Sequence, residues 1–368
     1  MSKTTLTVDP SFSKDIISFG GEGIKKCYQC GTCTSVCPVS EDTTVSFRKM
    51  IKYIQVGLPQ KALQMPGMWM CVNCRDCVAE CPRDANPSNI LAALRRYATS
   101  KYSNYNITKK LTLSPSIFGA ILLVPIILLA AIVGLTGTIE ADIATNGFVN
   151  FINPIYVDIG GIGIGVIVLI GILYNLLRIR SLIKQSPDQE NKGGMAGSFF
   201  KTVFSEVLTQ KWLYKCTSER LRWIAHLAVF WGFVAAAVTT SIVFITHGFG
   251  AGEPLALTDP TKILGNISGV LLIFGGTVLL ARRLIRRDIE TSYFDWLFII
   301  LIYIVSVTGV ITEVTRLVNS VPLAQVIYFI HLSTTATLLS LAPFTKFAHS
   351  VYRPVIMFLG RMKGMVKT

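Results

Sequence analysis

The stretch that decides the fold holds two copies of one cysteine pattern, CYQCGTCTSVCP at residues 27–38 and CVNCRDCVAECP at residues 71–82. Each copy has the spacing Cys-x2-Cys-x2-Cys-x3-Cys-Pro, and together they contain all but one of the chain's 9 cysteines. Three thiolates separated by two residues can bind three corners of one iron–sulfur cubane, while the fourth cysteine reaches a second cluster. The pattern therefore predicts two four-iron four-sulfur clusters.

The predicted ligand sets are crossed between the two copies. Three ligands of each cluster come from one copy and the fourth from the other, namely Cys27, Cys30, Cys33 and Cys81 for the first cluster and Cys71, Cys74, Cys77 and Cys37 for the second. Because each copy supplies a ligand to the other copy's cluster, neither half of this domain is expected to fold alone.

Two other uses of these cysteines fit the pattern less well. Zinc sites use two ligand pairs separated by a longer loop. Disulfides need an oxidising compartment, and the N-terminus, MSKTTLTVDP, has no apolar signal stretch.

A helix-like run at residues 45–57 lies between the copies and favours a helical dicluster domain over a small β-rich ferredoxin. The remaining cysteine, Cys216, is expected to be an inert thiol.

Composition indicates a membrane protein. The 368 residues are 51% hydrophobic and 15% charged, whereas ordinary soluble proteins have about 25% charged residues. The formal net charge is +14, but the basic residues lie between apolar runs and form no nucleic-acid-binding module. We therefore expect lipid around this chain and no nucleic-acid partner.

Six apolar runs are each long enough to cross a hydrocarbon layer of about 30 Å as helix. They lie near residues 115–136, 156–178, 222–246, 263–282, 293–313 and 323–346. The predicted fold is all-α, with a helical dicluster iron–sulfur domain followed by a six-helix transmembrane bundle. The expected parts are the cluster domain at 1–100, a linker at 101–114, a membrane domain at 115–350 and a basic tail at 351–368.

The distribution of Lys and Arg predicts the orientation in the cytoplasmic membrane, because cytoplasmic loops are enriched in these residues. The loop at 178–222, the turn after the fourth run and the C-terminal tail are rich in Lys and Arg. The opposite loops hold only Arg316. Both termini, and with them the iron–sulfur domain, are therefore expected in the cytoplasm.

Within the loop at 178–222, residues 199–208 alternate phenylalanines and aliphatic residues with polar ones. This pattern predicts a short helix that lies in the membrane interface. A surface helix covered by the cluster domain is an equal alternative at this point.

All 4 histidines lie in or near the third and sixth apolar runs. Two antiparallel helices with imidazoles at matching depths can hold two haems, each with its iron between two neutral histidines. We predict that His226 and His349 bind an inner haem b, and that His247 and His331 bind an outer one. A single inner haem remains if His247 lies in a loop. Histidines that only form hydrogen bonds between helices are the simpler alternative.

Two segments resemble known families. Residues 1–100, with KKCYQCGTCTSVCPVS and MCVNCRDCVAECPRDANP, look like the C-type iron–sulfur subunit of heterodisulfide reductase. Residues 205–360, with ERLRWIAHLAVFWGF and HLSTTATLLSLAPFTKFAHSVYRP, are similar to the nitrate reductase gamma subunit and to the cytochrome b subunit of membrane-bound heterodisulfide reductase. The resemblance implies a b-type cytochrome that exchanges electrons with a quinone or a similar carrier.

The sequence thus predicts an electron-transfer subunit that links a quinone-type carrier, two b haems and two clusters to a cytoplasmic catalytic partner. A separate partner is expected because no CCG-type motif or nucleotide fingerprint provides a substrate-reducing site here. The resemblance implies that this partner is of the heterodisulfide reductase B or D type. The candidate residues for the quinone site are Glu313, Arg316 and Lys262, since a carboxylate at membrane depth is usually functional. An equal alternative is that Glu313 only forms an ion pair with Arg316 at the water boundary. Two alternatives are a membrane anchor for a complex-II-like flavoprotein dehydrogenase and a structural anchor without a redox role.

Overall fold

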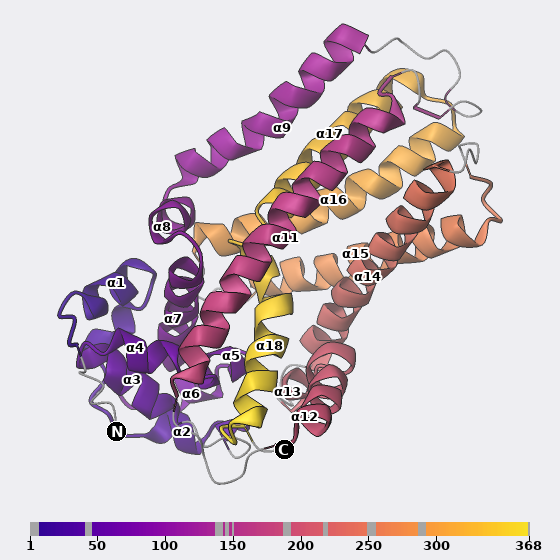
Figure 1. The fold of residues 1–368 in the computed structure, drawn as a ribbon. Coiled ribbons are helices and arrows are strands. Elements are labelled where there is room, and N and C mark those ends of the chain that lie inside the picture. Colours follow the sequence, from indigo (N-terminus) through magenta and orange to yellow (C-terminus); the bar gives the residue numbers. More distant parts are fainter. Residues whose placement is uncertain are drawn as a thin grey trace. The chain divides into compact units, whose positions relative to one another are not determined.

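The computed structural model describes residues 7–40, 46–136, 143, 147–148, 151–186, 193–215, 220–248, 255–285 and 292–366. Within these ranges the chain forms helices and no β-strand, which confirms the all-α prediction (Figure 1). The chain forms two compact units. We call them the cysteine unit, made of Met1–Leu113, Gly171–Arg220 and Lys346–Thr368, and the apolar unit, made of Ser114–Ile170 and Leu221–Thr345.

The N-terminal part of the cysteine unit consists of short helices. They are α1 (Phe12–Ser18), η1 (Glu22–Lys25), α2 (Thr32–Ser35), α3 (Phe47–Gln55), α4 (Pro59–Leu63), α5 (Gly67–Met70), α6 (Asp76–Ala79), α7 (Pro87–Tyr102) and α8 (Tyr105–Leu113). Helix α3 is the helix expected between the two cysteine copies, and the Ser46 side chain accepts a hydrogen bond from the backbone N–H of Lys49 at its start. The segment expected as a linker contains α8.

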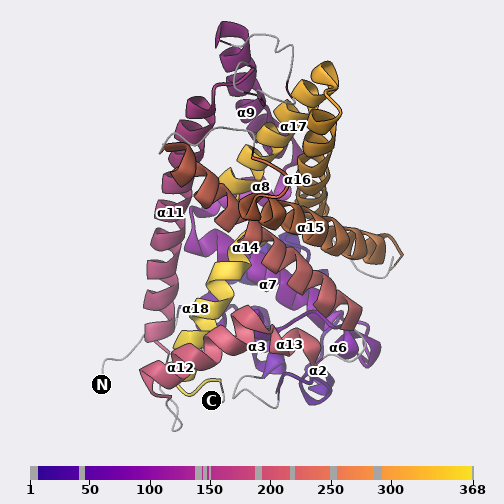
Figure 2. The same ribbon diagram turned by 90° about the vertical axis from the view of Figure 1, so that its right-hand side faces the viewer.

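Six helices are long and apolar enough to cross a membrane, as the sequence predicted. They are α9 (Pro115–Thr136), α11 (Pro154–Lys184), α14 (Arg220–Gly248), α15 (Pro260–Ile285), α16 (Tyr293–Leu317) and α17 (Val321–Ser340). In the apolar unit, α16 packs against α15 and α17, and α9 packs along α17 (Figure 2). Helices α14 and α15 approach closely at Gly275. A Cβ atom at this position would lie only 2.5 Å from the carbonyl oxygen of Ala225, so only glycine fits there.

The sixth apolar run is shorter than predicted. Helix α17 ends at Ser340 and is followed by a turn, the short helix η5 (Lys346–Ala348) and the separate helix α18 (His349–Met362). Pro343 accounts for the break, because proline has no backbone N–H and disfavours the helical conformation of the preceding residue. His331 and His349 therefore lie on different helices, so their separation is not set by one continuous helix.

Helix α18 completes the core of the cysteine unit. Its Tyr352 and Ile356 are 0% and 1% exposed and belong to the same cluster of buried side chains as Trp69 of α5 and Tyr102 of α7. The rings of Trp69, Tyr102 and Tyr352 lie 6.3–6.5 Å apart, centroid to centroid. Most of the segment expected as a basic tail is thus part of a folded core.

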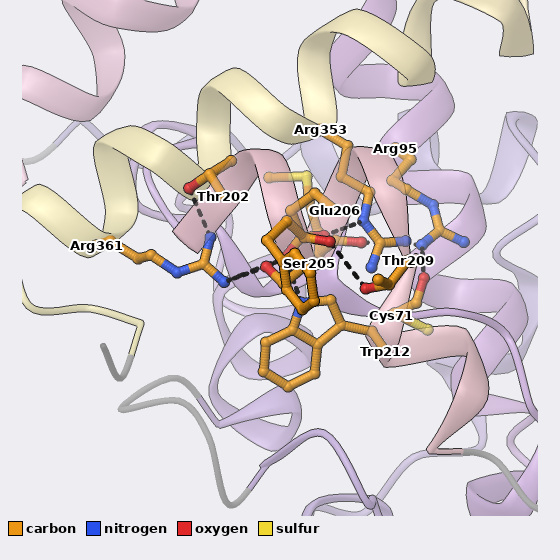
Figure 3. A network of polar contacts seen from close by, with 11 residues as sticks. Cys71, Arg95, Thr202, Ser205, Glu206, Thr209, Trp212, Arg353 and Arg361 are labelled. Carbon is orange, nitrogen blue, oxygen red and sulfur yellow. Dashed lines mark hydrogen bonds and ion pairs between the residues drawn. The ribbon is translucent and has the colours of Figure 1, made fainter. Parts of the chain in front are cut away.

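A buried charge network joins α18 to the segment formed by α12 (Met195–Thr202), the π-helix η3 (Val203–Leu208) and α13 (Lys211–Tyr214) (Figure 3). Arg353 and Arg361 of α18 form ion pairs with Glu206 of η3 at 3.1 and 3.3 Å. The Glu206 side chain is 1% exposed and also accepts a hydrogen bond from the indole of Trp212. One carboxylate therefore holds two arginines of the last helix.

Candidate iron–sulfur and haem sites

The two cysteine copies repeat one backbone conformation. Residues at the same place in each copy have positive φ, at 69° and 58° for Gln29 and Asn73 and at 94° and 77° for Gly31 and Arg75. A short helix then begins in each copy, α2 in the first and α6 in the second. Positive φ at Arg75 is uncommon for a residue with a side chain and occurs where the surroundings fix it. Both loops are therefore shaped to turn their cysteines toward one side.

Each set of cysteines surrounds a cavity. The first cavity has a volume of about 370 Å³, including its open mouth, and its lining includes Cys27, Cys30, Cys33 and Cys81. The second has a volume of about 400 Å³, and its lining includes Cys33, Cys37, Cys71, Cys74 and Cys77. In both cavities a cysteine of the other copy joins three cysteines of the same copy, and Cys33 borders both.

The side chains around the two cavities offer sulfur donors. Within the described ranges, no three His, Cys, Asp or Glu side chains are close enough to hold one metal ion. Four cysteines line the first cavity and five line the second. Each lining therefore contains the four sulfur donors that a four-iron four-sulfur cluster needs.

Several groups donate hydrogen bonds toward the cysteine sulfurs of the first cavity. The backbone N–H of Ala85 lies 3.3 Å from Cys81 Sγ, and the Gln29 amide lies 3.9 Å from Cys27 Sγ. The Thr32 hydroxyl lies 3.3 Å from Cys30 Sγ and lowers the pKa of that thiol. Hydrogen bonds to the ligating sulfurs are one of the factors that set a cluster's reduction potential.

The more buried cysteines have high pKa values. Burial raises the pKa of Cys33 to about 11 and that of Cys37 to about 12, and the neighbouring cysteines of the same cavities add to both shifts. These thiols are therefore protonated at neutral pH before metal binds. Cluster binding must displace their protons, because the thiolate is the ligand.

Arg95 is a charged residue beside the second cavity that the sequence did not single out. Its guanidinium donates hydrogen bonds to the carbonyl oxygens of Met68 and Cys71 at 2.9 and 2.6 Å (Figure 3). The positive charge thus lies against the backbone of the first cysteine in the second copy. A nearby positive charge stabilises the more negative, reduced state of a cluster.

The variant Arg95→Met is expected to shift the reduction potential of the second cluster to more negative values and to leave the first unchanged. Arg96→Met is the matched control, because Arg96 is the next residue of the same helix and its guanidinium binds the carbonyl oxygen of Phe19 in place of that of Cys71. A redox titration followed by electron paramagnetic resonance measures both clusters. Equal potentials in the two variants would contradict this role of Arg95.

One ring nitrogen of His331 contacts a backbone carbonyl, a contact that metal-ligating histidines commonly make. Its Nδ1 lies 3.1 Å from the carbonyl oxygen of Val305 and 3.2 Å from the hydroxyl of Thr308. In the tautomer with the proton on Nδ1, that nitrogen donates to the Val305 carbonyl and Nε2 is the acceptor nitrogen. The ring lies against Gly309, where an added Cβ would be 3.0 Å from Cε1. Helix α16 therefore holds the ring in position from two sides.

His349 begins α18, and its Nδ1 likewise contacts a backbone carbonyl, that of Lys346. Burial lowers the pKa of His349 to about 4, and the charges of Arg353, Lys346 and Arg95 contribute to this shift. Its imidazole is therefore neutral at pH 7, which is the form that ligates haem iron.

The two predicted histidine pairs stay predictions. His226 lies on α14 in the apolar unit, while its predicted partner His349 belongs to the cysteine unit. The side chain of His247, the predicted partner of His331, lies outside the described residues, as does Cys216.

The three candidate quinone-site residues come together in the apolar unit. Glu313 of α16 forms ion pairs with Lys262 of α15 at 2.5 Å and with Arg316 at 3.2 Å. The side chains are between 8% and 23% exposed. The carboxylate thus has two cationic partners from two helices.

Comparison with protein families first identifies the class of the N-terminal segment. Residues 23–85 match the model described as a 4Fe-4S dicluster domain. The match contains both cysteine copies, so it supports iron–sulfur clusters as cofactors of this segment.

Particular relatives are C-type subunits of archaeal enzymes. The chain is 35% identical over 91 residues to the C-type subunit of the H(2):CoB-CoM heterodisulfide,ferredoxin reductase of Methanothermobacter thermautotrophicus, which covers 25% of this chain and 49% of the relative. It is 36% identical over 102 residues to a C-type iron–sulfur subunit of the CoB--CoM heterodisulfide reductase of Methanocaldococcus jannaschii, covering 26% of this chain and 54% of the relative. The chain thus spans about half the length of these relatives, and the predicted resemblance to the C-type subunit is supported for its N-terminal quarter. The resemblance predicted for residues 205–360 stays a prediction.

Proposed function

We propose that this chain is a membrane-bound electron-transfer subunit that connects a quinone-type carrier in the bilayer with a cytoplasmic catalytic partner of the heterodisulfide reductase type. One observation carries the proposal. The same chain contains a dicluster segment similar to the C-type subunits of heterodisulfide reductases and six helices that are long and apolar enough to cross a membrane.

The cysteines would hold two four-iron four-sulfur clusters in the crossed arrangement. Its support is the lining of the two cavities, in which Cys81 joins the first copy and Cys37 the second. When bound, the clusters and haems supply one-electron redox chemistry. The protein contributes thiolates, hydrogen bonds to sulfur and the positive charge of Arg95.

The histidines would hold b-type haem, with His226 and His349 for an inner haem and His247 and His331 for an outer one. The backbone hydrogen bonds of His331 and His349 support ligation through Nε2, because each leaves that nitrogen as the acceptor. Glu313, Lys262 and Arg316 are the proposed quinone-site residues, on the outer side of the membrane by the order of the six helices. With six spans both termini would lie on the same side of the membrane, and the distribution of Lys and Arg supports the cytoplasm as that side.

Haem content tests the proposal. Purified full-length protein is expected to show b-type haem in a pyridine haemochrome spectrum, together with about eight iron atoms in clusters per chain. The variants His226→Ala and His349→Ala are each expected to remove the same haem. Thr334→Ala is the matched control, because the hydroxyl of this α17 residue bonds to backbone carbonyls of its own helix. Protein that contains both clusters and no haem would contradict the cytochrome role.

A further inference from the structure

One face of α12 and η3 is apolar and uncovered within the cysteine unit. It consists of Met195, Phe199, Phe200 and Phe204, which are between 52% and 70% exposed. We call these four side chains the aromatic face. Apolar side chains of this size are more stable out of water, so leaving four of them exposed to water is unfavourable.

The opposite face of the same helices is polar and buried, so the usual arrangement of an amphipathic helix is reversed. Ser198, Thr202, Ser205 and Glu206 are between 2% and 8% exposed. Arg361 donates hydrogen bonds to Thr202 and Ser205 at 2.7 and 3.0 Å and is itself 2% exposed. These contacts, which Figure 3 shows, bury the polar side of the segment and leave the aromatic face exposed.

The segment lies between two helices that are apolar enough to cross a membrane. Helix α11 ends at Lys184 and α14 begins at Arg220. The end of α11 and the start of α12 are also held by the same part of α18. Lys363 donates a hydrogen bond to the carbonyl oxygen of Lys184, and the Gly193 N–H donates one to that of Arg361. The aromatic face is therefore anchored beside the end of a membrane helix.

The charges around the aromatic face favour a membrane surface over another protein. Lys201 and Lys211 are exposed on the same segment. Lysines flanking phenylalanines on a short amphipathic helix are typical of segments that lie in the headgroup layer, where each lysine is attracted to anionic lipid.

We propose that the aromatic face inserts into the headgroup layer of the bilayer that the six helices cross, and that it binds anionic lipid there. The sequence also allowed a surface helix whose apolar side is covered by the cluster domain. We do not adopt that alternative for the aromatic face, because the cysteine unit buries the polar side of the segment and leaves the apolar side exposed. This inference is independent of the redox role, since it needs only membrane insertion of the chain.

Site-specific photocrosslinking tests the proposal in the full chain. Phe200→p-benzoylphenylalanine, in vesicles of phosphatidylcholine and phosphatidylglycerol, is expected to give lipid adducts that mass spectrometry detects. Tyr28→p-benzoylphenylalanine is the matched control. Tyr28 is an aromatic residue, 58% exposed, on the rim of the first cysteine cavity, and it is expected to give no lipid adduct.

A second measurement uses the conservative variant Phe200→Trp. Lipid with bromine on the acyl chain is expected to quench the added tryptophan, while Tyr28→Trp is expected to stay unquenched. Adducts between two copies of the chain, or between the chain and another protein, in place of lipid adducts would overturn the proposal. Absence of both lipid adducts and quenching at position 200 would also overturn it.

Discussion

Replacing Glu206 with alanine is expected to lower the free energy of unfolding of the cysteine unit by about 3–5 kcal/mol. The variant leaves Arg361, 2% exposed, without its carboxylate partner and removes the ion pair of Arg353. An uncompensated buried charge is far more costly than an exposed one. A urea titration of the purified protein, followed by the loss of cluster absorbance, measures the change.

Two further variants test whether the loss of stability comes from the buried ion pairs of Glu206 or from the removal of any carboxylate. Glu80→Ala removes an exposed carboxylate and is expected to change the free energy of unfolding by less than about 0.5 kcal/mol. The double variant Glu206→Leu with Arg361→Met replaces two buried charges by apolar groups and is expected to recover much of the loss, because apolar replacements of whole buried pairs are often neutral. Equal stability of Glu206→Ala and Glu80→Ala would show that the network contributes little.

Replacing Cys37 with serine is expected to remove the cluster of the second cysteine copy, and Cys81→Ser that of the first. Each variant should lose about four of eight cluster iron atoms. The physical reason is the crossed lining of the cavities, in which Cys37 lies with Cys71, Cys74 and Cys77. Iron and acid-labile sulfide analysis gives the count, and electron paramagnetic resonance identifies the cluster that remains.

The ninth cysteine provides the control for this experiment. Cys216→Ser is expected to keep both clusters, because Cys216 belongs to neither copy. Loss of the cluster of the same copy in Cys37→Ser and Cys81→Ser would mean that each copy binds its own four-cysteine cluster.

The local features of this protein could be predicted well from its sequence. The cysteine spacing predicted two clusters, the family comparison supports iron–sulfur cofactors in the matching segment, and the lengths of the apolar runs predicted six candidate membrane helices. These features depend on neighbours within one helix or one loop. The end of the last run was predicted six residues too late, although Pro343 was a visible signal for an earlier end.

Contacts between distant segments could not be predicted from the sequence alone. Glu206 and Arg361 are 155 residues apart, and nothing in either local pattern indicates the other. The role of Arg95 depends in the same way on the fold, because it binds the backbone of a loop 24 residues earlier. The alternating pattern at 199–208 predicted an amphipathic helix, but which face turns inward is decided by Arg361 on α18.

The position of α18 also determines when, during synthesis, the core of the N-terminal segment can be completed. The first 113 residues leave the ribosome before any of the six apolar helices, yet their core needs Tyr352 and Ile356 from α18. Until then Trp69 and Tyr102 lack one of their aromatic neighbours, so this core is incomplete. Newly made protein that lacks α18 is therefore expected to be less stable and to be degraded before it acquires both clusters.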